Sequence, residues 1–297
     1  MIHFSVVIPN LHTPTVGETV ASLEHQTYDH AHYEVIVVGM DKYNLVRESD
    51  LVHFDRSDVP LSPARARNRG VAQARGDVIV FTDADCLARP DWLAVLAERF
   101  SDPAVTVVGG GVDIRSRNFW TLADNISMFY EYLDIHPAGE RLQLPSLNLA
   151  IRRQAFKEVC GFDERYPRPS SEDADLTIRL RKRGHRLYFE PRAVVAHQPP
   201  RNRLRDLLRH GYYQGMYSTK VDPRYANEEG LPGLLHTRLG VALFSPLLAA
   251  GVVLRVFAKY KSLRPYWYTA PMIFLSKMAW CFGAAARPDE RIWSQSV

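Results

Sequence analysis

Cysteine is scarce in this chain of 297 residues, which contains only Cys86, Cys160 and Cys281. None of the three has the paired spacing of a zinc site or of a redox motif, so the sequence indicates a reduced, cytoplasmic setting. The chain enters an apolar run at once, without the basic stretch and the cleavage site of a signal peptide. Secretion is therefore not expected.

Strong charge of one sign is also missing. The formal net charge is +4 at pH 7. This mild excess suits an enzyme that handles anionic substrates or works beside an anionic membrane, and it is too small to predict nucleic-acid binding. The hydrophobic content of 46% is enough for a substantial core, which excludes a mainly disordered chain.

Short runs rich in β-branched residues alternate with helix-like stretches in the first third of the chain. The runs, each interpreted as a buried strand, are residues 4–8, 35–38, 78–81 and 105–108. The expected helices are residues 16–26, 63–74 and 91–100, and a later one covers 173–183. This alternation predicts an α/β fold with a parallel sheet that helices cover on both faces.

Two aspartates follow the run at residues 78–81, where a parallel sheet would bind its ligand. Asp83 and Asp85 are separated by one residue, a spacing that can direct both carboxylates into one crevice. Carboxylate oxygens suit Mg²⁺ or Mn²⁺, which would bridge a pyrophosphate. Because the same triplet is common in solvated turns, it does not identify a metal site by itself.

A helix start at Ser62 and Pro63 precedes a run of polar side chains. We expect some of them to reach a ligand, although a solvated helix face is the plainer interpretation of the first and last members. The run consists of Arg65, Arg67, Asn68 and Arg69.

A second acidic cluster, Glu172, Asp173 and Asp175, begins the expected helix at 173–183. Acidic residues at a helix start complement the helix dipole, which is a purely structural explanation. The alternative is catalytic, because a carboxylate separate from a metal-binding pair can take a proton from a hydroxyl group.

His197 follows the apolar run at residues 193–196. A single histidine at a strand end is more often a hydrogen-bonded structural residue than a ligand. Its position after the second acidic cluster also allows it to bind the same metal as Asp85 or to contact a diphosphate.

The last third combines apolar stretches with basic residues. Residues 239–254 carry no charge but are shorter than the ~20 apolar residues of a spanning helix, and Pro271 and Lys277 interrupt residues 266–285. Two interpretations remain open, a membrane-surface hairpin and an amphipathic pair packed on the preceding domain. The arginines at 179–186 and 201–209 form a solvated face or approach anionic headgroups or a lipid diphosphate.

The order and spacing of these motifs resemble the catalytic domain of glycosyltransferase family 2, which has the nucleotide-diphospho-sugar transferase (GT-A) fold. The resemblance covers about residues 1–200, and its segments are residues 5–10, 22–26, 33–38, 66–70, 76–85, 147–153, 161–164 and 172–176. It implies a Rossmann-like, mostly parallel central sheet in a catalytic domain at 1–200. Its nucleotide-binding part would be 1–115 and its acceptor-side part 116–200, followed by a basic and apolar helical extension at 201–297.

The resemblance also implies roles for individual residues. Asp173 matches the general base of an inverting single displacement, and Glu172 would orient the acceptor or the base. Asp85 would bind the metal directly, while Asp83 would contact the ribose or the metal. The remaining implied residues line the nucleotide pocket, namely Pro9, Asn10, Arg67 and Asn68, or fall on the acceptor side, namely Asn148 and Arg152.

One segment departs from the family pattern. The family has Asp-Asp-Gly-Ser after its second strand, with an early aspartate that reads the nucleobase, whereas residues 38–43 here are Val-Gly-Met-Asp-Lys-Tyr. Asp41 is the residue that could substitute from a shifted position. This departure leaves the identity of the donor nucleobase open, and a UDP-sugar is the favoured donor.

The expected activity is inverting transfer of a sugar from a nucleotide-diphospho-sugar to a hydroxyl of a glycan or a lipid-linked acceptor, with Mn²⁺ or Mg²⁺. The expected place is the cytoplasm, including the inner face of the cell membrane through residues 201–297. A nucleotidyltransferase is an alternative, although residues 9–14 lack its glycine-rich basic loop. A second alternative is a degenerate subunit that binds a partner or membrane, and retention of both acidic clusters counts against it.

Overall fold

The computed structural model describes residues 3–115, 118–222, 225 and 237–287. The chain divides into two compact units. The sheet unit comprises residues 1–114, 131–167 and 172–199, and the helical unit comprises residues 115–130, 168–171 and 200–297. The predicted acceptor-side part at 116–200 is thus divided between the two units.

The sheet unit is built on one mixed sheet, in which the described strands follow the order β3-β2-β1-β4-β8-β6-β9-β5, with β7 paired to β9. Pairing is parallel from β3 to β4 and between β6 and β9, and antiparallel at β8, β5 and β7. The strands are β1 (Phe4–Leu11), β2 (Tyr33–Met40), β3 (Val52–Arg56), β4 (Val78–Thr82), β5 (Cys86–Ala88), β6 (Val107–Val112), β7 (Gly139–Glu140), β8 (Asn148–Arg152) and β9 (Leu187–His197).

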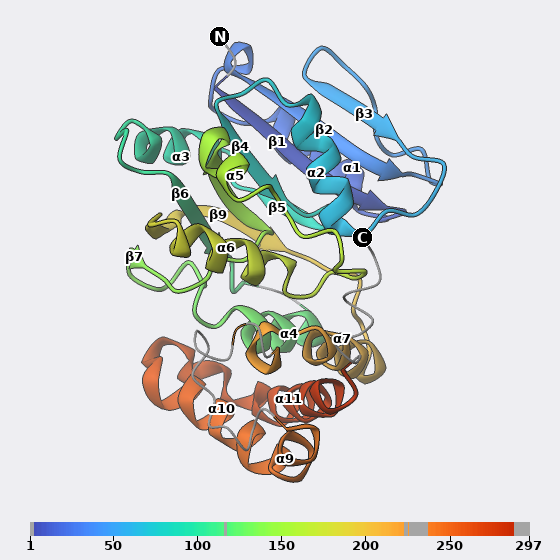
Figure 1. Ribbon diagram of the computed structural model, residues 1–297, viewed down its shortest axis with the longest axis vertical. Coiled ribbons are helices and arrows are strands. Elements are labelled where there is room, and N and C mark those ends of the chain that lie inside the picture. The colour runs from blue at the N-terminus through green and yellow to red at the C-terminus, as the bar shows by residue number, and fades with distance from the viewer. Residues whose placement is uncertain (1–2, 116–117, 223–224, 226–236, 288–297) are drawn as a thin grey trace. The chain divides into compact units, whose positions relative to one another are not determined.

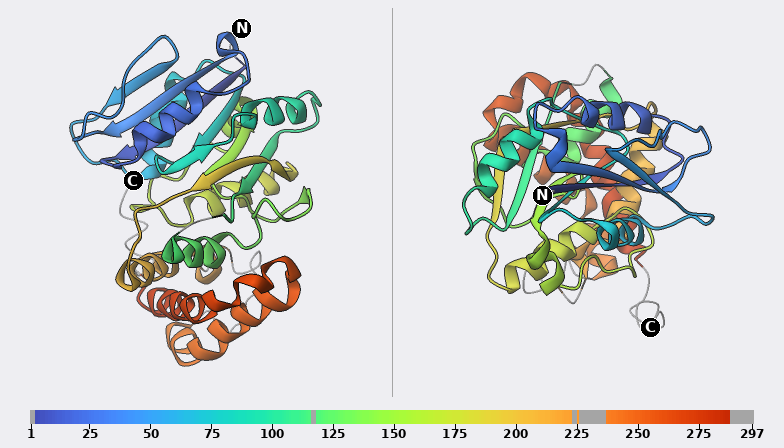
Figure 2. Two further views of the ribbon diagram at one scale, coloured as in Figure 1. Left: turned by 180° about the vertical axis from the view of Figure 1, so that it is seen from behind. Right: turned by 90° about the horizontal axis from the view of Figure 1, so that it is seen from above.

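Helices cover both faces of this sheet, with α2, α5 and α6 on one face and α1 and α3 on the other (Figures 1 and 2). The helices of the sheet unit are α1 (Val16–Glu24), η1 (His30–His32), α2 (Pro63–Gln73), α3 (Trp92–Phe100), α5 (Arg153–Glu158) and α6 (Glu172–Lys182). At the start of α2 the Ser62 hydroxyl accepts a hydrogen bond from the Arg65 N–H, the capping that Ser-Pro predicts. The predicted α/β class is confirmed.

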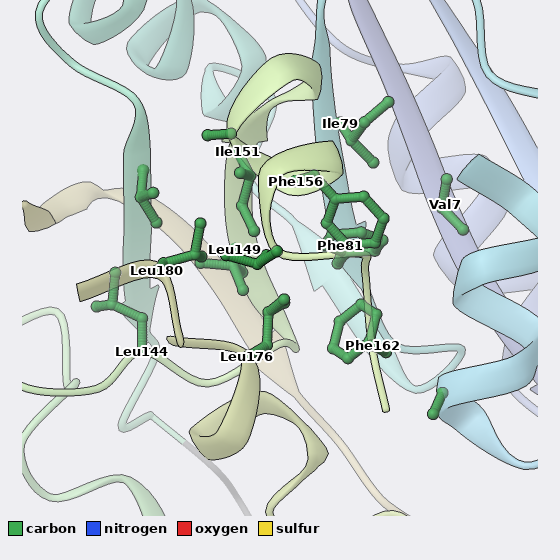
Figure 3. Close-up of a cluster of buried hydrophobic side chains, with 14 of the residues drawn as sticks. Val7, Ile79, Phe81, Leu144, Leu149, Ile151, Phe156, Phe162, Leu176 and Leu180 are labelled. Carbon is green, nitrogen blue, oxygen red and sulfur yellow. The ribbon is translucent and has the colours of Figure 1, made fainter. Parts of the chain in front are cut away.

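A hydrophobic core lies between the sheet and the helices α2, α5 and α6 (Figure 3). Phe81 of β4 meets Phe162 edge to face, with ring centroids 5.1 Å apart, and Leu176 of α6 is fully buried in the same cluster. Both acidic clusters directly adjoin this core in the sequence, since Phe81 precedes Asp83 and Leu176 follows Asp173. Tight packing here fixes the strand end and the helix start from which the carboxylates project.

In the part of the helical unit that the structure describes, the elements are α-helices and 3₁₀ segments. The elements are α4 (Phe119–Phe129), α7 (Leu204–Met216), η2 (Thr219–Val221), α9 (Arg238–Leu243), α10 (Ser245–Lys259), η5 (Lys261–Thr269) and α11 (Ala270–Ala285). Helices α7 and α11 approach so closely that only glycine fits at two positions. A Cβ atom at Gly215 would collide with the Trp280 carbonyl, and one at Gly283 would collide with the Tyr212 carbonyl.

Residues 266–285, which the sequence showed as an apolar stretch interrupted by Pro271 and Lys277, are divided between η5 and α11. Pro271 lies in the first turn of α11, and Lys277 lies within this helix. Proline is tolerated at this position because it lies in the first turn. Backbone N–H groups of the first turn have no partner within the helix, so the missing N–H of proline removes no hydrogen bond. Among the described residues, no helix combines the length and the apolar character needed to cross a bilayer.

The arginine run at 201–209 is not a uniform solvated face. Arg201 donates a hydrogen bond to Asp124 at 2.6 Å, and His210 Nδ1 lies 2.8 Å from the other oxygen of this fully buried carboxylate. Arg201 therefore serves the interior of the helical unit, whereas Arg203, Arg205 and Arg209 are exposed.

Candidate active site

The Asp83–Asp85 turn is held in place by hydroxyl groups of α1 and of the residue that precedes it. The Ala84 carbonyl accepts hydrogen bonds from the hydroxyls of Thr19, at 2.9 Å, and Thr15, at 3.3 Å. The Cys86 N–H closes the turn on the Asp83 carbonyl at 3.1 Å. Because these hydrogen bonds fix the backbone around Ala84, the two carboxylates project from a rigid turn.

His197 lies beside Asp85, as the sequence suggested it could. The antiparallel pairing of β5 with β9 places Cys86 opposite His197, and the Gln198 N–H donates to the Asp85 carbonyl at 2.8 Å. His197 Nε2 is 3.7 Å from Asp85 Oδ1, and the histidine side chain is almost fully buried. The strand register thus brings together an imidazole and a carboxylate that are 112 positions apart in the chain.

Arg67 joins the two acidic clusters. From α2 its buried guanidinium donates to Asp83 Oδ1 at 2.7 Å and to Glu172 Oε1 at 2.8 Å. Burial alone would lower the pKa of Arg67, but the negative charges of Asp83 and Glu172 outweigh it and raise this pKa. The face of Phe162 lies 5.4 Å from the guanidinium carbon. Arg67 is therefore a permanently charged clamp, and its contact with a nucleotide stays a prediction.

Asp173 stands at the start of α6, next to Glu172. Its Oδ2 accepts the Ser146 N–H at 3.0 Å, and its Oδ1 accepts the Ala174 N–H at 2.8 Å. Burial raises the pKa of Asp173 in spite of these hydrogen bonds. Burial, followed by the charge of Asp173, also raises the pKa of Glu172, to about 7, against the opposing effect of Arg67. A carboxyl group with a raised pKa is suited to accepting a proton near neutral pH.

Three of the residues expected at the nucleotide pocket hold loops in place. Asn68 exchanges hydrogen bonds with the backbone of Phe162, and Asn10 bonds to the Met40 carbonyl and the Thr13 N–H. Asp41 accepts backbone N–H groups of its own loop, from residues 43, 45 and 46. Pro9 is half-buried beside Asn10 in β1. Whether any of the four contacts a nucleotide stays a prediction.

Asn148 and Arg152, the acceptor-side residues, have structural contacts in the sheet. Asn148 accepts the Trp92 indole N–H at 2.9 Å and donates to the carbonyls of Gly111 and Ala193. Arg152 donates to carbonyls of residues 100, 102 and 105. These contacts connect β8 to its neighbours.

Sequence reasoning missed Thr15, Thr19 and Ser146. The two threonines bond to the Ala84 carbonyl between Asp83 and Asp85, and the Ser146 N–H bonds to Asp173. Each belongs to a segment distant in the chain from its partner. The only available signal was the position of the threonines on the helix that follows β1.

The donor atoms of this site fit a divalent cation that is shared with a substrate. Among the described residues, no three His, Cys, Asp or Glu side chains gather to hold a metal by themselves. Asp85 and His197 provide two donors side by side, while Asp83 gives one oxygen to Arg67. Mg²⁺ and ions like it are commonly held by one or two protein ligands together with phosphate oxygens and water.

A family model described as "Glycosyl transferase family 2" matches residues 5–160, more than half of the chain. The chain belongs to glycosyltransferase family 2. This confirms the predicted family and enzyme class, and it decides against the nucleotidyltransferase alternative.

Two curated proteins illustrate the relatives of this family 2 glycosyltransferase. The "Pre-mycofactocin glycosyltransferase" of Mycobacterium tuberculosis is 34% identical over 160 residues, which cover 52% of this chain and 33% of that protein. The "Glucosyl-dolichyl phosphate glucuronosyltransferase" of Haloferax volcanii is 27% identical over 234 residues, which cover 69% and 71%. The chain thus spans only a third of the length of the mycobacterial relative.

Solved structures share the architecture. The mannosyltransferase PcManGT from Pyrobaculum calidifontis, in complex with GDP-Man and Mn²⁺, has a TM-score of 0.55 at 18% identity, over 92% of this chain and 85% of that one. S. aureus TarS 1-349 has a TM-score of 0.54 at 16% identity, over 95% and 90%. At such identities the likeness establishes the fold alone, and it confirms the predicted GT-A architecture.

Proposed function

We propose that this enzyme transfers a sugar from a nucleotide-diphospho-sugar to an acceptor hydroxyl with inversion at the anomeric carbon. The observation that supports this best is the Arg67 clamp, because it holds Asp83 and Glu172 against one guanidinium. Asp173 takes the proton as the acceptor oxygen bonds to the anomeric carbon, while the bond to the diphosphate oxygen breaks on the opposite side. The ion pair of Glu172 with Arg67 holds the start of α6, and thereby Asp173, in position.

Mn²⁺ or Mg²⁺ is the proposed cofactor, held by Asp85 and His197 with Asp83 as their neighbour. When bound, the cation neutralises the charge that develops on the departing diphosphate. The 3.7 Å separation of the imidazole and the carboxylate supports this assignment. PcManGT has been solved with Mn²⁺, which supports a divalent cation as the cofactor of this enzyme.

A UDP-sugar is the favoured donor. TarS has been solved with UDP-GlcNAc, whereas PcManGT has been solved with GDP-Man, so both bases occur on this fold. We propose that the loop at 41–46, which Asp41 shapes, borders the nucleobase, and that Pro9 and Asn10 lie beneath it. Arg67 and Asn68 complete the nucleotide side of the proposed pocket from α2.

The proposed acceptor is a lipid-linked or glycan hydroxyl, as in polysaccharide biosynthesis at the inner face of the cell membrane. In the helical unit, a groove of about 770 Å³ has Leu204, Leu208 and Tyr212 beside Arg205 and Arg209. An apolar strip next to guanidinium groups suits the chain and the phosphate of an anionic lipid. The dolichyl phosphate in the name of the Haloferax relative also favours the lipid-linked class.

A thermal-shift panel of UDP-, GDP- and dTDP-sugars, each with Mn²⁺, Mg²⁺ or EDTA, tests the donor and the cofactor. We expect stabilisation by UDP-sugars that requires the cation, because a ligand of the folded state raises the melting temperature. Product analysis by NMR should then show an inverted anomeric centre. Absence of a response to every nucleotide would favour the degenerate-subunit alternative.

A further inference from the structure

Four leucines on the helical unit are exposed in a way that folding alone does not explain. They lie on α9 and α10, which follow one another at residue 244. We call them the leucine ridge, and their exposed fractions are 77% for Leu239, 69% for Leu243, 70% for Leu247 and 69% for Leu254. Single exposed leucines are ordinary on protein surfaces, but four of them at helical spacing on consecutive helices indicate an interaction site.

The leucine ridge lies opposite the face that α9 and α10 bury. The buried residues Val241, Ser245, Ala249 and Val256 repeat at the same spacing as the ridge, two positions further along the chain. Two helical residues correspond to a rotation of about 200°, so the two stripes point in opposite directions. A surface helix normally presents polar residues on its outer face, whereas these helices are apolar on both.

The segment of the chain that carries the ridge has basic charges only. Residues 230–288 contain no aspartate or glutamate. Five basic side chains of the described residues 237–287 are exposed, namely Arg238, Arg255, Lys259, Lys261 and Arg264, while Lys277 and Arg287 are partly buried. A second copy that met this face symmetrically would bring like charges together, while an anionic bilayer would be attracted by them.

We propose that the leucine ridge binds the surface of a bilayer that contains anionic phospholipids, an inference that rests on the proposed location at the inner face of the cell membrane. The leucines would enter the boundary between headgroups and acyl chains, with α9 and α10 parallel to the surface. Helices of 6 and 15 residues are too short to cross the ~30 Å hydrocarbon layer. Exposed Arg255 and Lys259 at the end of α10 would contact lipid phosphates, and exposed Trp267 suits the headgroup layer.

Vesicle sedimentation tests this surface without any assay of sugar transfer. Binding of the full chain is compared on vesicles of phosphatidylcholine alone and on vesicles with about one third phosphatidylglycerol. We expect strong binding only to the anionic vesicles, and a loss of about tenfold or more when all four ridge leucines are changed to glutamine. The charge variant Arg255→Glu with Lys259→Glu should weaken binding to the anionic vesicles as well.

A matched control separates the ridge from general surface hydrophobicity. Leu142 of the sheet unit is 70% exposed, the same as Leu247. Leu142→Gln should leave vesicle binding unchanged, whereas Leu247→Gln should weaken it, and circular dichroism should show both variants folded. Unchanged binding by the fourfold variant, equal binding to neutral vesicles, or a dimer in sedimentation that the fourfold variant dissociates would each overturn the proposal.

Discussion

The two acidic clusters of the sheet unit are supported in different ways. Asp83 and Asp85 flank a turn that hydroxyl groups and a strand register immobilise, with His197 beside the second carboxylate. Glu172 and Asp173 begin a helix, and burial raises the pKa of both. A rigid carboxylate beside an imidazole is suited to binding a cation, while a carboxyl group with a raised pKa is suited to accepting a proton. In the proposed mechanism, the first cluster lies on the leaving-group side of the reaction and the second provides the base.

Removal of the clamp should have the largest effect on stability. Arg67→Ala leaves Asp83 without its ion pair and Glu172 buried without one, and we expect the free energy of unfolding to fall by about 3–5 kcal/mol. Urea denaturation measures this change. Arg65→Ala on the same helix is the control, because its pair with Glu164 is exposed on both sides and should contribute less than about 1 kcal/mol. Equal losses in the two variants would show that the clamp has no special role.

Asp85→Asn tests the cation side of the comparison. The amide keeps the shape of the side chain but removes its charge, so Mn²⁺-dependent affinity for UDP should fall by roughly 100-fold. Titration calorimetry with and without Mn²⁺ measures this affinity. In EDTA, the affinity for UDP should be the same in the wild type and the variant. If the variant keeps the full dependence of UDP affinity on Mn²⁺, Asp85 is not a metal ligand.

His197→Ala decides between a ligand and a structural histidine. If the imidazole binds the cation, Mn²⁺-dependent affinity for UDP falls by about tenfold, with a smaller effect than Asp85→Asn. Thermal unfolding without metal is measured in parallel. Lower stability with unchanged dependence on Mn²⁺ would assign His197 to the packing between β5 and β9 instead.

The pH dependence of kcat/KM examines the base side. A general base must be ionised, and burial keeps Asp173 protonated to a higher pH than an ordinary aspartate, whose pKa is about 3.9. The rate should therefore rise with pH through this raised pKa. Because Glu172 and Asp173 interact, the observed limb belongs to the pair. Glu172→Gln removes a neighbouring negative charge and should move the limb to lower pH, and an unmoved limb would contradict the coupling.

The sequence predicted the strands β1, β2 and β4 and the helices α1, α2, α3 and α6 because these have apolar periodicity and clear start signals. It did not predict β3, whose five residues include two exposed side chains, or the antiparallel insertion of β8 between β4 and β6. It also did not predict α4 at residues 119–129, where packing within the helical unit overrides weak local preference.

The individual site residues were found through their motifs, but their partners were not. The pair between Arg67 and Glu172 spans 105 positions, and no local pattern encodes such a contact. Contact of Arg67 with the nucleotide stays a prediction, and its ion pairs with two carboxylates, from a side chain that is 2% exposed, were not predicted. Long-range ion pairs depend on how α2 and α6 pack on the same face of the sheet, which only the folded chain defines.

The most direct test of the proposed division between cation side and base is the variant Asp173→Asn. Its affinity for UDP in the presence of Mn²⁺ should remain within about twofold of the wild type, while kcat for sugar transfer should fall by at least ~100-fold. Such a result would place the lost function in proton transfer and leave the donor site intact. Turnover close to the wild-type rate would contradict the assignment of Asp173 as the base.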